Sequence, residues 1–391
     1  MVNLVIPLAG LGARFANIEI PKSLITVGDK TNIEWSLSCI DRTISCRTIF
    51  VIRPDQQINF SLADILKNMF GESCYIVFTK GFTRGATETV LAAEEYINNS
   101  TPLVIYCPDV YFEPHLNISS MVNEEGIDGR LWIFKANSLN YSYVETYKNY
   151  AVRTAEKKII SPYAAVGVYK YSKGSDFVQI AKEMINKDDT TNNEFYICPT
   201  YNYLINQGKI IATSFVEKVH IFGTPEEMNF FVNCSMRTFS NYKKSVALCS
   251  DHSGYEVKEG TKKELDKLGI KYIDFGTFNS RDCDYTGYVQ ESCNAIKRND
   301  CSFGLGFCRT GQGINITANK IKRIRSALVF DPYTAEYAIR HNCANFFSVP
   351  TKYIDTPEKV GILIKAWLYN TFDGGRHQNR LQGAEDDNIS S

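Results

Sequence analysis

The chain has 391 residues, more than one domain commonly holds, and 44% of them are hydrophobic, which is enough apolar material for two separate cores. Lysine plus arginine and aspartate plus glutamate each total 43, so the charge balance favours neither a nucleic acid nor an anionic membrane surface as partner. No apolar run approaches the roughly 20 residues that a membrane-spanning helix needs, so we expect no membrane segment.

Cysteine usage and the opening segment indicate the compartment. Twelve cysteines are scattered along the chain without a CxxC pair, a pattern that argues against a zinc site or a disulfide framework. Most of them are therefore expected to be small core residues in a reducing environment. The first ten residues, MVNLVIPLAG, are typical of a buried strand and lack the basic start and cleavage site of a signal peptide, so we expect a cytoplasmic protein.

The first part of the chain, residues 1–237, alternates apolar runs with helix-like stretches. Strands are predicted at 4–9, 48–53, 74–79 and 102–109, one helix at 85–97 and a closing helix at 222–234. Alternation of this kind implies a mostly parallel sheet with helices on both faces. We therefore predict an α/β domain with a doubly wound sheet.

A second domain is predicted over 245–381. Apolar periodicity is lost at 236–244, and a new series of strands and helices begins at residue 245. Five strands are expected in the segments VALCS, KYIDFG, FGLGFC, SALVF and NFFSV, separated by helical stretches. This again indicates a doubly wound parallel sheet, smaller than the first. The residues 382–391 are polar and are expected to form a disordered tail.

A glycine-rich loop, PLAGLGARF, follows the first predicted strand. Gly10 and Gly12 would let backbone N–H groups approach phosphate oxygens, and Arg14 would add a bidentate donor. From the spacing alone, a tight turn without a ligand is an equally good interpretation.

Further motifs favour the phosphate loop. The run PLAGLGARF…PKSLITVGDKTNIEWSL resembles the opening of the sugar-phosphate nucleotidyltransferases. The segments TRGATETVLAAEEYI, YCPD, AEKKIISPYAAVGVYKY, NNEFYICPTYNYLI and FGTPEEM resemble later motifs of that family and occur in the family's order. The resemblance covers about residues 1–235 and implies the Rossmann-like sheet of that family.

The resemblance implies that a phosphate-bearing sugar or polyol attacks the α-phosphorus of an NTP and releases pyrophosphate. Catalysis would be mostly positioning and charge neutralisation. Asp109 would bind Mg²⁺ and Lys157 the sugar phosphate. The nucleotide would be bound by Gly10, Gly12, Arg14, Lys22 and Gly85. Two positions depart from the family pattern: Ile221 stands where many relatives have a second metal-binding aspartate, and Val110 where close relatives often have a polar residue.

In the second domain a cysteine stands at the start of another glycine loop, LGFCRTGQGINITANK. Thr310, Gly311 and Gly313 can form a nest of N–H groups at the start of a helix. A Cys308 thiolate next to such an anion hole could abstract a proton beside a carbonyl group and leave a stabilised enediolate. From this stretch alone, a buried cysteine before a turn is the alternative.

Other polar motifs surround this loop in the sequence. Asp251 and His252 follow the first strand of the domain, where α/β sheets bind ligands. The motifs RDCDYTGY, RHNCAN and GGRHQNR supply Tyr285, His341, Asn342, Arg376 and Arg380. Over about residues 245–381 these motifs, in this order, resemble the type B ribose-5-phosphate isomerases and their galactose-6-phosphate relatives.

That resemblance implies a cofactor-free aldose–ketose isomerase in which Cys308 moves a proton between C1 and C2. Thr310 and the amides of Gly311 and Gly313 would stabilise the enediolate, and His341, assisted by Asp251, would open the sugar ring. The phosphate would be bound by His252, Arg376 and Arg380, and the sugar would be lined by Tyr285 and Asn342. The family assembles its site from two subunits, so a homodimer through this domain is implied.

Three positions depart from this second pattern: Arg309 stands where relatives usually have glycine, Thr286 stands where proline is common, and Lys352 stands near the position where relatives often have an arginine for the phosphate. The sequence therefore predicts a bifunctional enzyme that isomerises a pentose phosphate and activates a sugar or polyol phosphate with an NTP. In the specific form of this prediction, the NTP is CTP and the enzyme makes precursors of a surface polysaccharide. The alternatives are an isomerase with a non-catalytic nucleotide-binding module, and a sugar-phosphate sensor without catalysis.

Overall fold

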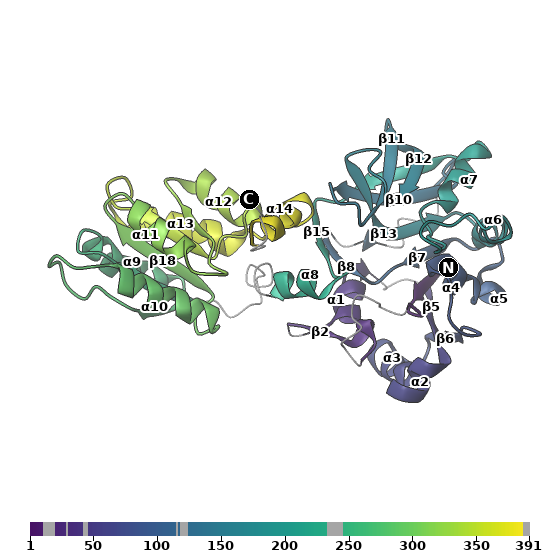
Figure 1. The fold of residues 1–391 in the computed structure, drawn as a ribbon, viewed down its shortest axis with the longest axis horizontal. Helices are drawn as coiled ribbons and strands as arrows, with labels where there is room; N and C mark the ends of the chain where they lie inside the picture. Colours follow the sequence, from purple (N-terminus) through teal and green to yellow (C-terminus); the bar gives the residue numbers. More distant parts are fainter. Residues whose placement is uncertain are drawn as a thin grey trace. The chain divides into compact units, whose positions relative to one another are not determined.

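The structure is a computed structural model that describes residues 1–10, 20–28, 30–41, 46–114, 116–117, 124–232 and 245–385. The chain divides into two compact units, Met1–Met228 and Asn229–Ser391 (Figure 1). The domain limits expected from the sequence, 1–237 and 245–381, stay a prediction, because the residues between them lie outside the described part. No helix in the described ranges has both the length and the apolar composition that crossing a bilayer requires.

The first unit is built on a large mixed sheet. Its strand order is β10 (Gly129–Lys135), β14 (Ile211–Phe215), β12 (Tyr150–Glu156), β11 (Ser142–Tyr147), β13 (Tyr163–Tyr171), β7 (Leu103–Tyr106), β1 (Val2–Pro7), β5 (Cys46–Ile52) and β6 (Tyr75–Phe78). Two further strands, β8 (Val110–Glu113) and β15 (Lys218–Ile221), pair with each other. Short two-residue strands pair as β2 (Thr26–Val27) with β3 (Lys30–Thr31) and β4 (Ile40–Asp41) with β9 (Leu116–Asn117).

The sheet of the first unit is less parallel than the sequence suggests. Strands β7, β1, β5 and β6 are parallel, as predicted, but β11, β12 and β13 pair antiparallel with their neighbours. The hairpin between β11 and β12 turns at Lys148 and Asn149, both with positive φ (48° and 66°). Positive φ at both central residues is the conformation of the turns that suit two-residue hairpins. The prediction of a mostly parallel sheet was therefore wrong for this half.

Helices flank the first sheet. They are η2 (Lys22–Leu24), α1 (Asn32–Ser38), α2 (Pro54–Phe60), α3 (Leu62–Phe70), α4 (Ala86–Leu91), α5 (Glu94–Ile97), α6 (Gly174–Asn186), α7 (Thr200–Asn206) and α8 (Pro225–Phe230). The one helix predicted over 85–97 is two, because the amides of Ala92 and Ala93 bond to carbonyls three residues back instead of four. The main core lies between the sheet and α4 to α7, with Val5, Val90 and Phe177 among its buried members.

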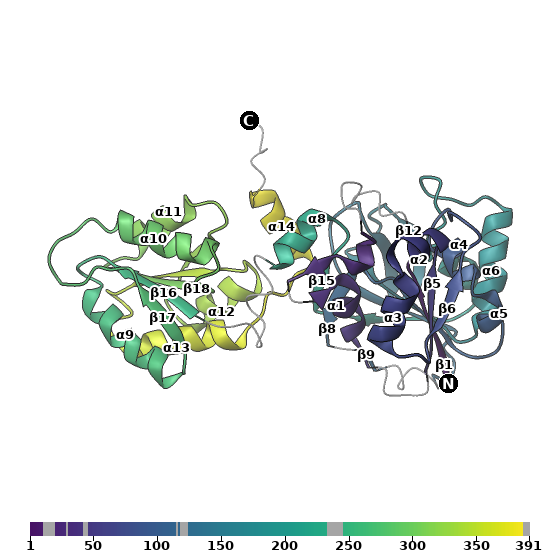
Figure 2. The same cartoon turned by 90° about the horizontal axis from the view of Figure 1, so that it is seen from below.

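The second unit is a doubly wound parallel sheet in three layers, as predicted. The strand order is β17 (Lys271–Asp274), β16 (Ser245–Ser250), β18 (Phe303–Cys308), β20 (Phe346–Pro350) and β19 (Ser326–Leu328), and all pairs are parallel. Figure 2 shows α10 (Thr286–Lys297) and α11 (Gln312–Asn319) on one face, and α9 (Tyr255–Lys267), α12 (Pro332–Arg340) and α13 (Pro357–Tyr369) on the other. A last helix, α14 (Arg376–Glu385), follows.

Each face of the second sheet has its own core. Phe303 and Phe347 pack with Trp367 of α13 in one cluster, whereas Cys249, Cys308 and Ile314 belong to the other. Successive residues of a strand point to opposite faces, so a continuous apolar run such as FGLGFC fills both cores. The α/β class predicted for both halves is thus confirmed.

Candidate functional site

The phosphate loop predicted in the first unit begins at Gly10, just beyond the carboxyl end of β1. Arg53, which follows β5, donates hydrogen bonds from Nη1 to the carbonyl oxygens of Ala9 (2.6 Å) and Gly10 (3.0 Å). Its guanidinium therefore fixes the start of the loop, a role not apparent from the sequence. Gly12 and Arg14 lie outside the described residues.

Lys22 and Asp109 lie together at the same edge of the sheet, although they are far apart in the sequence. Lys22 Nζ is 2.7 Å from Asp109 Oδ2, and the two side chains are 19% and 50% exposed. Asp109 follows β7, so its carboxylate is at the carboxyl end of a central parallel strand. A half-exposed carboxylate beside a cation fits a Mg²⁺ ion that is held mainly by the phosphates of a ligand.

The surroundings of Asp109 supply no second carboxylate from β15. Ile221 pairs with Val110 across the β8–β15 ladder, and the amide of Phe222 donates to the Asp109 carbonyl at 2.7 Å. Within the described ranges, no three His, Cys, Asp or Glu side chains are grouped so that they could hold a metal ion.

Gly85 has a packing reason for being glycine. It precedes α4 with a φ of 122°, and a Cβ there would lie 2.5 Å from the carbonyl oxygen of Phe195. The same carbonyl accepts the amide of Thr87 at 3.1 Å. The close approach joins the loop before α4, which contains the predicted nucleotide-binding Gly85, to the segment before α7.

Lys157, the predicted sugar-phosphate ligand, sits just beyond β12. Its ammonium donates to the Tyr196 hydroxyl and lies 4.7 Å from the centre of that ring. Burial raises the pKa of the neighbouring Glu156 to about 7, although Ser142 donates a hydrogen bond to its carboxylate. A half-buried lysine beside a carboxyl group of this kind is suited to a polar, anionic ligand.

In the second unit, Cys308 is the last residue of β18 and is 5% exposed. Its carbonyl accepts the amide of Thr351 at 3.0 Å. The loop then turns through Thr310 and Gly311, whose φ of 73° places it in the left-handed region before α11. A Cβ at Gly313 would lie 2.2 Å from the Tyr285 hydroxyl oxygen, so the structure brings that phenol against the loop.

Asp251 and His252 lie at the same edge, after β16. The Asp251 amide donates to the Phe307 carbonyl at 3.0 Å, which places Asp251 beside the strand that ends at Cys308. Asp251 Oδ1 accepts the Gly254 amide at 2.8 Å. His252 Nδ1 lies 3.1 Å from Asp282 Oδ1, a partner that the sequence did not reveal.

The remaining predicted residues form a separate cluster around α12 and α14. His341, at the end of α12, stacks on His377 with ring centres 4.1 Å apart and 15° between the planes. Arg376 Nε donates to His377 Nε2 at 3.3 Å, and Asp373 Oδ2 lies 3.7 Å from His341 Nε2. Arg380, one helical turn further on, adds its charge to both imidazoles.

Burial and nearby positive charge lower the pKa of both imidazoles. Burial and the neighbouring His341, Arg376 and Arg380 lower the pKa of His377 to about 4. Burial also lowers the pKa of His341, and the Asp373 carboxylate only partly offsets this. Asn342 is exposed next to the pair. No motif in the sequence marks Asp373. His377 is part of the GGRHQNR motif, which indicates no role for it.

The two clusters of the second unit lie at opposite ends of the strands of one sheet. Cys308 is at the carboxyl end of β18. His341 precedes β20, and Asn345, the residue just before β20, accepts a hydrogen bond from the amide of Gly304 at the start of β18. His341 therefore lies towards the amino end of these strands. All strands are parallel, so these are opposite ends, and a six-residue strand is about 20 Å long. The two clusters of predicted residues are therefore far apart within one chain.

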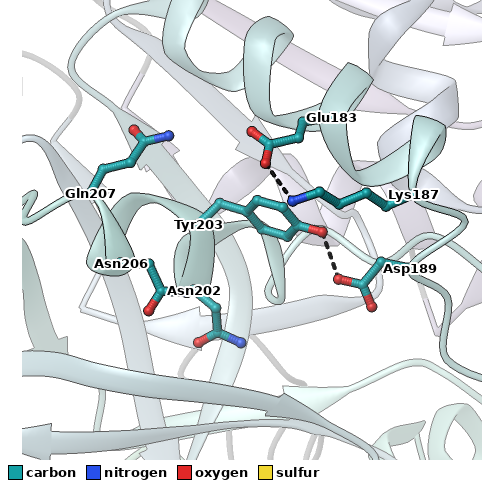
Figure 3. A pocket seen from close by; sticks show the side chains of 7 residues that line it. All are labelled: Glu183, Lys187, Asp189, Asn202, Tyr203, Asn206 and Gln207. Carbon is teal, nitrogen blue, oxygen red and sulfur yellow. Dashed lines mark hydrogen bonds and ion pairs between the residues drawn. The ribbon is translucent and has the colours of Figure 1, made fainter.

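One hollow of the first unit is lined by none of the predicted residues. Figure 3 shows this pocket of about 690 Å³ between α6 and α7, lined by Glu183, Lys187, Asp189, Asn202, Tyr203, Asn206 and Gln207. Four of its polar side chains pair with one another: Tyr203 donates to Asp189 at 2.7 Å and Lys187 to Glu183 at 2.7 Å. A second hollow of about 420 Å³ lies along the edge strand β17.

Comparison with known proteins agrees with the two units. A model of the ribose/galactose isomerase family matches residues 246–383. Ribose-5-phosphate isomerase B of Escherichia coli K12 is 32% identical over 139 residues, which cover 36% of this chain and 93% of that protein. A putative sugar phosphate isomerase of Bacillus subtilis 168 is 36% identical over 137 residues, 35% of this chain and 91% of that protein.

The first unit has a structural neighbour. The crystal structure of a nucleoside-diphosphate-sugar pyrophosphorylase from Vibrio cholerae RC9 superimposes on the N-terminal part with a TM-score of 0.51 and 24% identity, and covers 59% of this chain and 99% of the other. This likeness shows a shared fold. The protein thus joins a nucleotidyltransferase-type fold to an isomerase-type unit. Through residues 246–383 the chain belongs to the ribose/galactose isomerase family.

Proposed function

We propose that the second unit interconverts an aldose phosphate and a ketose phosphate of the pentose type, such as ribose 5-phosphate and ribulose 5-phosphate. The observation that carries the proposal is the position of Cys308, which ends β18 beside the glycine loop of a chain that belongs to an isomerase family. The thiolate would take the proton from C2 of the open-chain aldose and return it to C1. Thr310 and the amides of Gly311 and Gly313 would bind the charge of the enediolate.

The other half-site would prepare and hold the substrate. His341 can accept the proton of the anomeric hydroxyl and return it to the ring oxygen as the bond between the anomeric carbon and that oxygen breaks, with Asp251 as its proposed assistant. Arg376 and Arg380 lie one turn apart on α14 and would bind the phosphate with His252. Tyr285 and Asn342 would line the sugar. These roles require residues from both edges of the sheet at one substrate.

We infer a homodimer from this separation, because a second copy can bring its His341 to the Cys308 of the first. An aromatic ridge on α12 supports such an interface. Tyr333 is 67% exposed and lies 4.5 Å from Tyr337, which in turn lies 4.6 Å from His341, ring centre to ring centre. Exposed aromatic rings continuous with a candidate half-site are typical of interface cores.

Subunit complementation tests both the chemistry and the dimer. We expect C308A and H341N each to lower the formation of ribulose 5-phosphate from ribose 5-phosphate by about 1000-fold. Refolding the two variants together should restore about a quarter of the activity, because about half of the dimers are mixed and each mixed dimer has one intact site. No recovery from a demonstrably mixed dimer would contradict the composite site, and full activity of C308A would contradict the cysteine base.

For the first unit we propose nucleotidyl transfer from an NTP to a sugar or polyol phosphate. The Lys22–Asp109 pair at the carboxyl edge supports this, together with the fold shared with a pyrophosphorylase. A bound Mg²⁺ would supply charge neutralisation at the phosphates, with Asp109 as its protein ligand. Lys22 and, by resemblance, Arg14 would screen the triphosphate, and Lys157 would hold the acceptor phosphate.

A rival interpretation rests on Ile221. With an apolar side chain beside Asp109, the first unit could bind nucleotides without turnover, as a module that regulates or scaffolds the isomerase. Pyrophosphate release separates the two: the chain is supplied with Mg²⁺, each NTP in turn and a panel of sugar and polyol phosphates. Release of pyrophosphate with one combination of NTP and sugar or polyol phosphate supports the transferase. Nucleotide binding without pyrophosphate release in every combination supports the non-catalytic module.

We also propose that the two reactions are consecutive, so that the isomerase product is activated directly or after reduction by another enzyme. In the specific form of this proposal, CTP is the nucleotide donor, the activated product is a precursor of a surface polysaccharide, and the protein is cytoplasmic. Ribose 5-phosphate, Mg²⁺ and CTP should then give pyrophosphate, alone or with an added reductase. Release only with unrelated sugar phosphates would discard the coupling.

A further inference from the structure

A buried ion cluster lies beside the candidate cysteine half-site. The Lys258 side chain, on α9, is 0% exposed, and its ammonium bonds to Asp274 Oδ2 at the end of β17 and lies 3.0 Å from Glu259 Oε1. Lys262 Nζ is 2.7 Å from the same two carboxylates. None of these residues has a role in the proposed reaction.

The other oxygen of Asp274 reaches the loop after β17. Asp274 Oδ1 accepts the Gly276 amide at 2.9 Å. Gly276 has a φ of 116°, and a Cβ there would lie 2.7 Å from the Tyr288 ring. The backbone of the loop is therefore packed closely against Tyr288 at a position that requires glycine. The Gly276 carbonyl accepts the Ser250 amide at 2.7 Å, and the Thr277 amide donates to the Ser250 carbonyl at 3.1 Å. Asp274 is thereby connected to the residue that precedes Asp251.

The far side of the Asp251–Gly254 turn is attached to the same cluster. The amide of Lys258 donates to the Gly254 carbonyl at 3.0 Å, so the clamped lysine is one helical turn from Gly254. Gly254 in turn packs on the strand of the candidate base: a Cβ there would lie 2.4 Å from the Phe307 carbonyl oxygen. Asp251 and His252 therefore lie between two anchor points of one ion cluster.

Buried ion pairs seldom add net stability, because desolvation of the charges costs about as much as their attraction returns. In some proteins such a cluster instead fixes the geometry of the groups around it. We infer that Lys258 and Asp274 are positioning residues of the isomerase half-site: through Gly276 and Ser250 on one side and Gly254 on the other, they hold Asp251 and His252 against the strand that ends at Cys308. The inference concerns how the site is held and, for its kinetic consequence, rests on the proposed isomerase function.

A matched pair of variants in the full chain tests it. K258M/D274N removes the buried charge but keeps an oxygen for the Gly276 amide, whereas K258M/D274L, of similar volume, removes both. We expect the Asn variant, which loses the Lys258 ion pair but keeps the Gly276 contact, to lower kcat/KM about 3-fold. The Leu variant, which loses both, should lower it about 10-fold or more, chiefly through KM, because His252 would bind the phosphate. The two variants should melt within about 5 °C of each other. K267M, at the exposed Lys267–Glu264 pair of the same helix, is the control and should match wild type.

Amide exchange gives a readout that needs no activity. Peptides covering residues 249–256 should exchange about 10-fold faster in K258M/D274L than in K258M/D274N, while the rest of the unit is unchanged. If K258M/D274L does not fold, K258M alone serves, because Lys262 still pairs with Asp274 at 2.7 Å; the same peptides should then exchange faster than in K267M. Equal exchange and equal kcat/KM across the variants would overturn the inference. A wild-type chain without isomerase activity would instead contradict the proposed function and leave the exchange result to decide.

Discussion

The imidazole of His377 lies against that of His341 with 15° between the ring planes, and Arg340, Arg376, Arg380 and Asp373 surround the pair. Burial and the surrounding positive charges lower the pKa of both rings. His377, with a pKa of about 4 against an ordinary value of 6.5, gives the clearest consequence for stability.

The folded state binds a proton at His377 less readily than the unfolded chain does. This contribution to stability is therefore complete above pH 6.5 and is lost as the pH falls from 6.5 towards 4. We expect H377Q to weaken the loss of stability of the second unit between pH 7 and pH 5 by about 1 kcal/mol, measured by urea unfolding at several pH values. An identical pH dependence in wild type and H377Q would show that the ring has the same pKa in the folded and the unfolded chain.

Lys22 and Asp109 should matter for turnover and little for folding. The pair is half exposed on its acidic side, and exposed ion pairs contribute about 0–1 kcal/mol. If the proposed transfer occurs, K22M and D109N should each lower pyrophosphate release by about 100-fold or more, because each removes charge that screens or orients the phosphates. K67M, at the exposed Lys67–Glu72 pair, is the control. Release that is unchanged in D109N would remove this carboxylate from the proposed metal site.

Gly85 and Gly208 allow backbone strain to be separated from a steric clash. Both have positive φ, 122° and 79°, but a Cβ would lie 2.5 Å from Phe195 oxygen at Gly85 and would meet nothing within 4 Å at Gly208. We expect G208A to cost about 1 kcal/mol of stability and G85A about 2–4 kcal/mol, measured by chemical denaturation. Similar losses in the two variants would mean that the Phe195 segment moves aside.

The fold could be predicted where apolar runs are continuous. LVIPLA and FGLGFC are buried on both faces, so their composition alone marks central parallel strands. β11 and β12 could not be found in this way, since their exposed residues, such as Tyr147, Tyr150 and Val152, blur the alternation between buried and exposed positions. Their hairpin depends on a turn at Lys148 and Asn149, which has no glycine to mark it.

The candidate sites were predictable as sets of residues and not as arrangements. Cys308 and His341 are each marked by a motif, but only the strand order shows that they lie at opposite ends of one sheet. Asp274 and Lys258 could not be singled out, because a lysine and an aspartate in a polar sequence normally indicate a solvated surface. Arg53 follows a strand without any motif, and its contact with the phosphate loop exists only in three dimensions.

Tyr333 offers a test of the proposed interface without touching either half-site's polar groups. Its ring is 67% exposed on α12 and leads through Tyr337 to His341. In a homodimer that buries this ridge, Y333R would place a charge in an apolar contact, so the dimer should dissociate at least about 10-fold more readily in analytical ultracentrifugation. Isomerase activity should fall with the dimer fraction and return at high protein concentration, because each site needs residues from two chains.

Y369R, at a tyrosine that is 76% exposed on α13, is the matched control and should stay dimeric and active. A Y333R protein that remains dimeric would place the interface elsewhere, and a monomer with full isomerase activity would mean that one chain suffices.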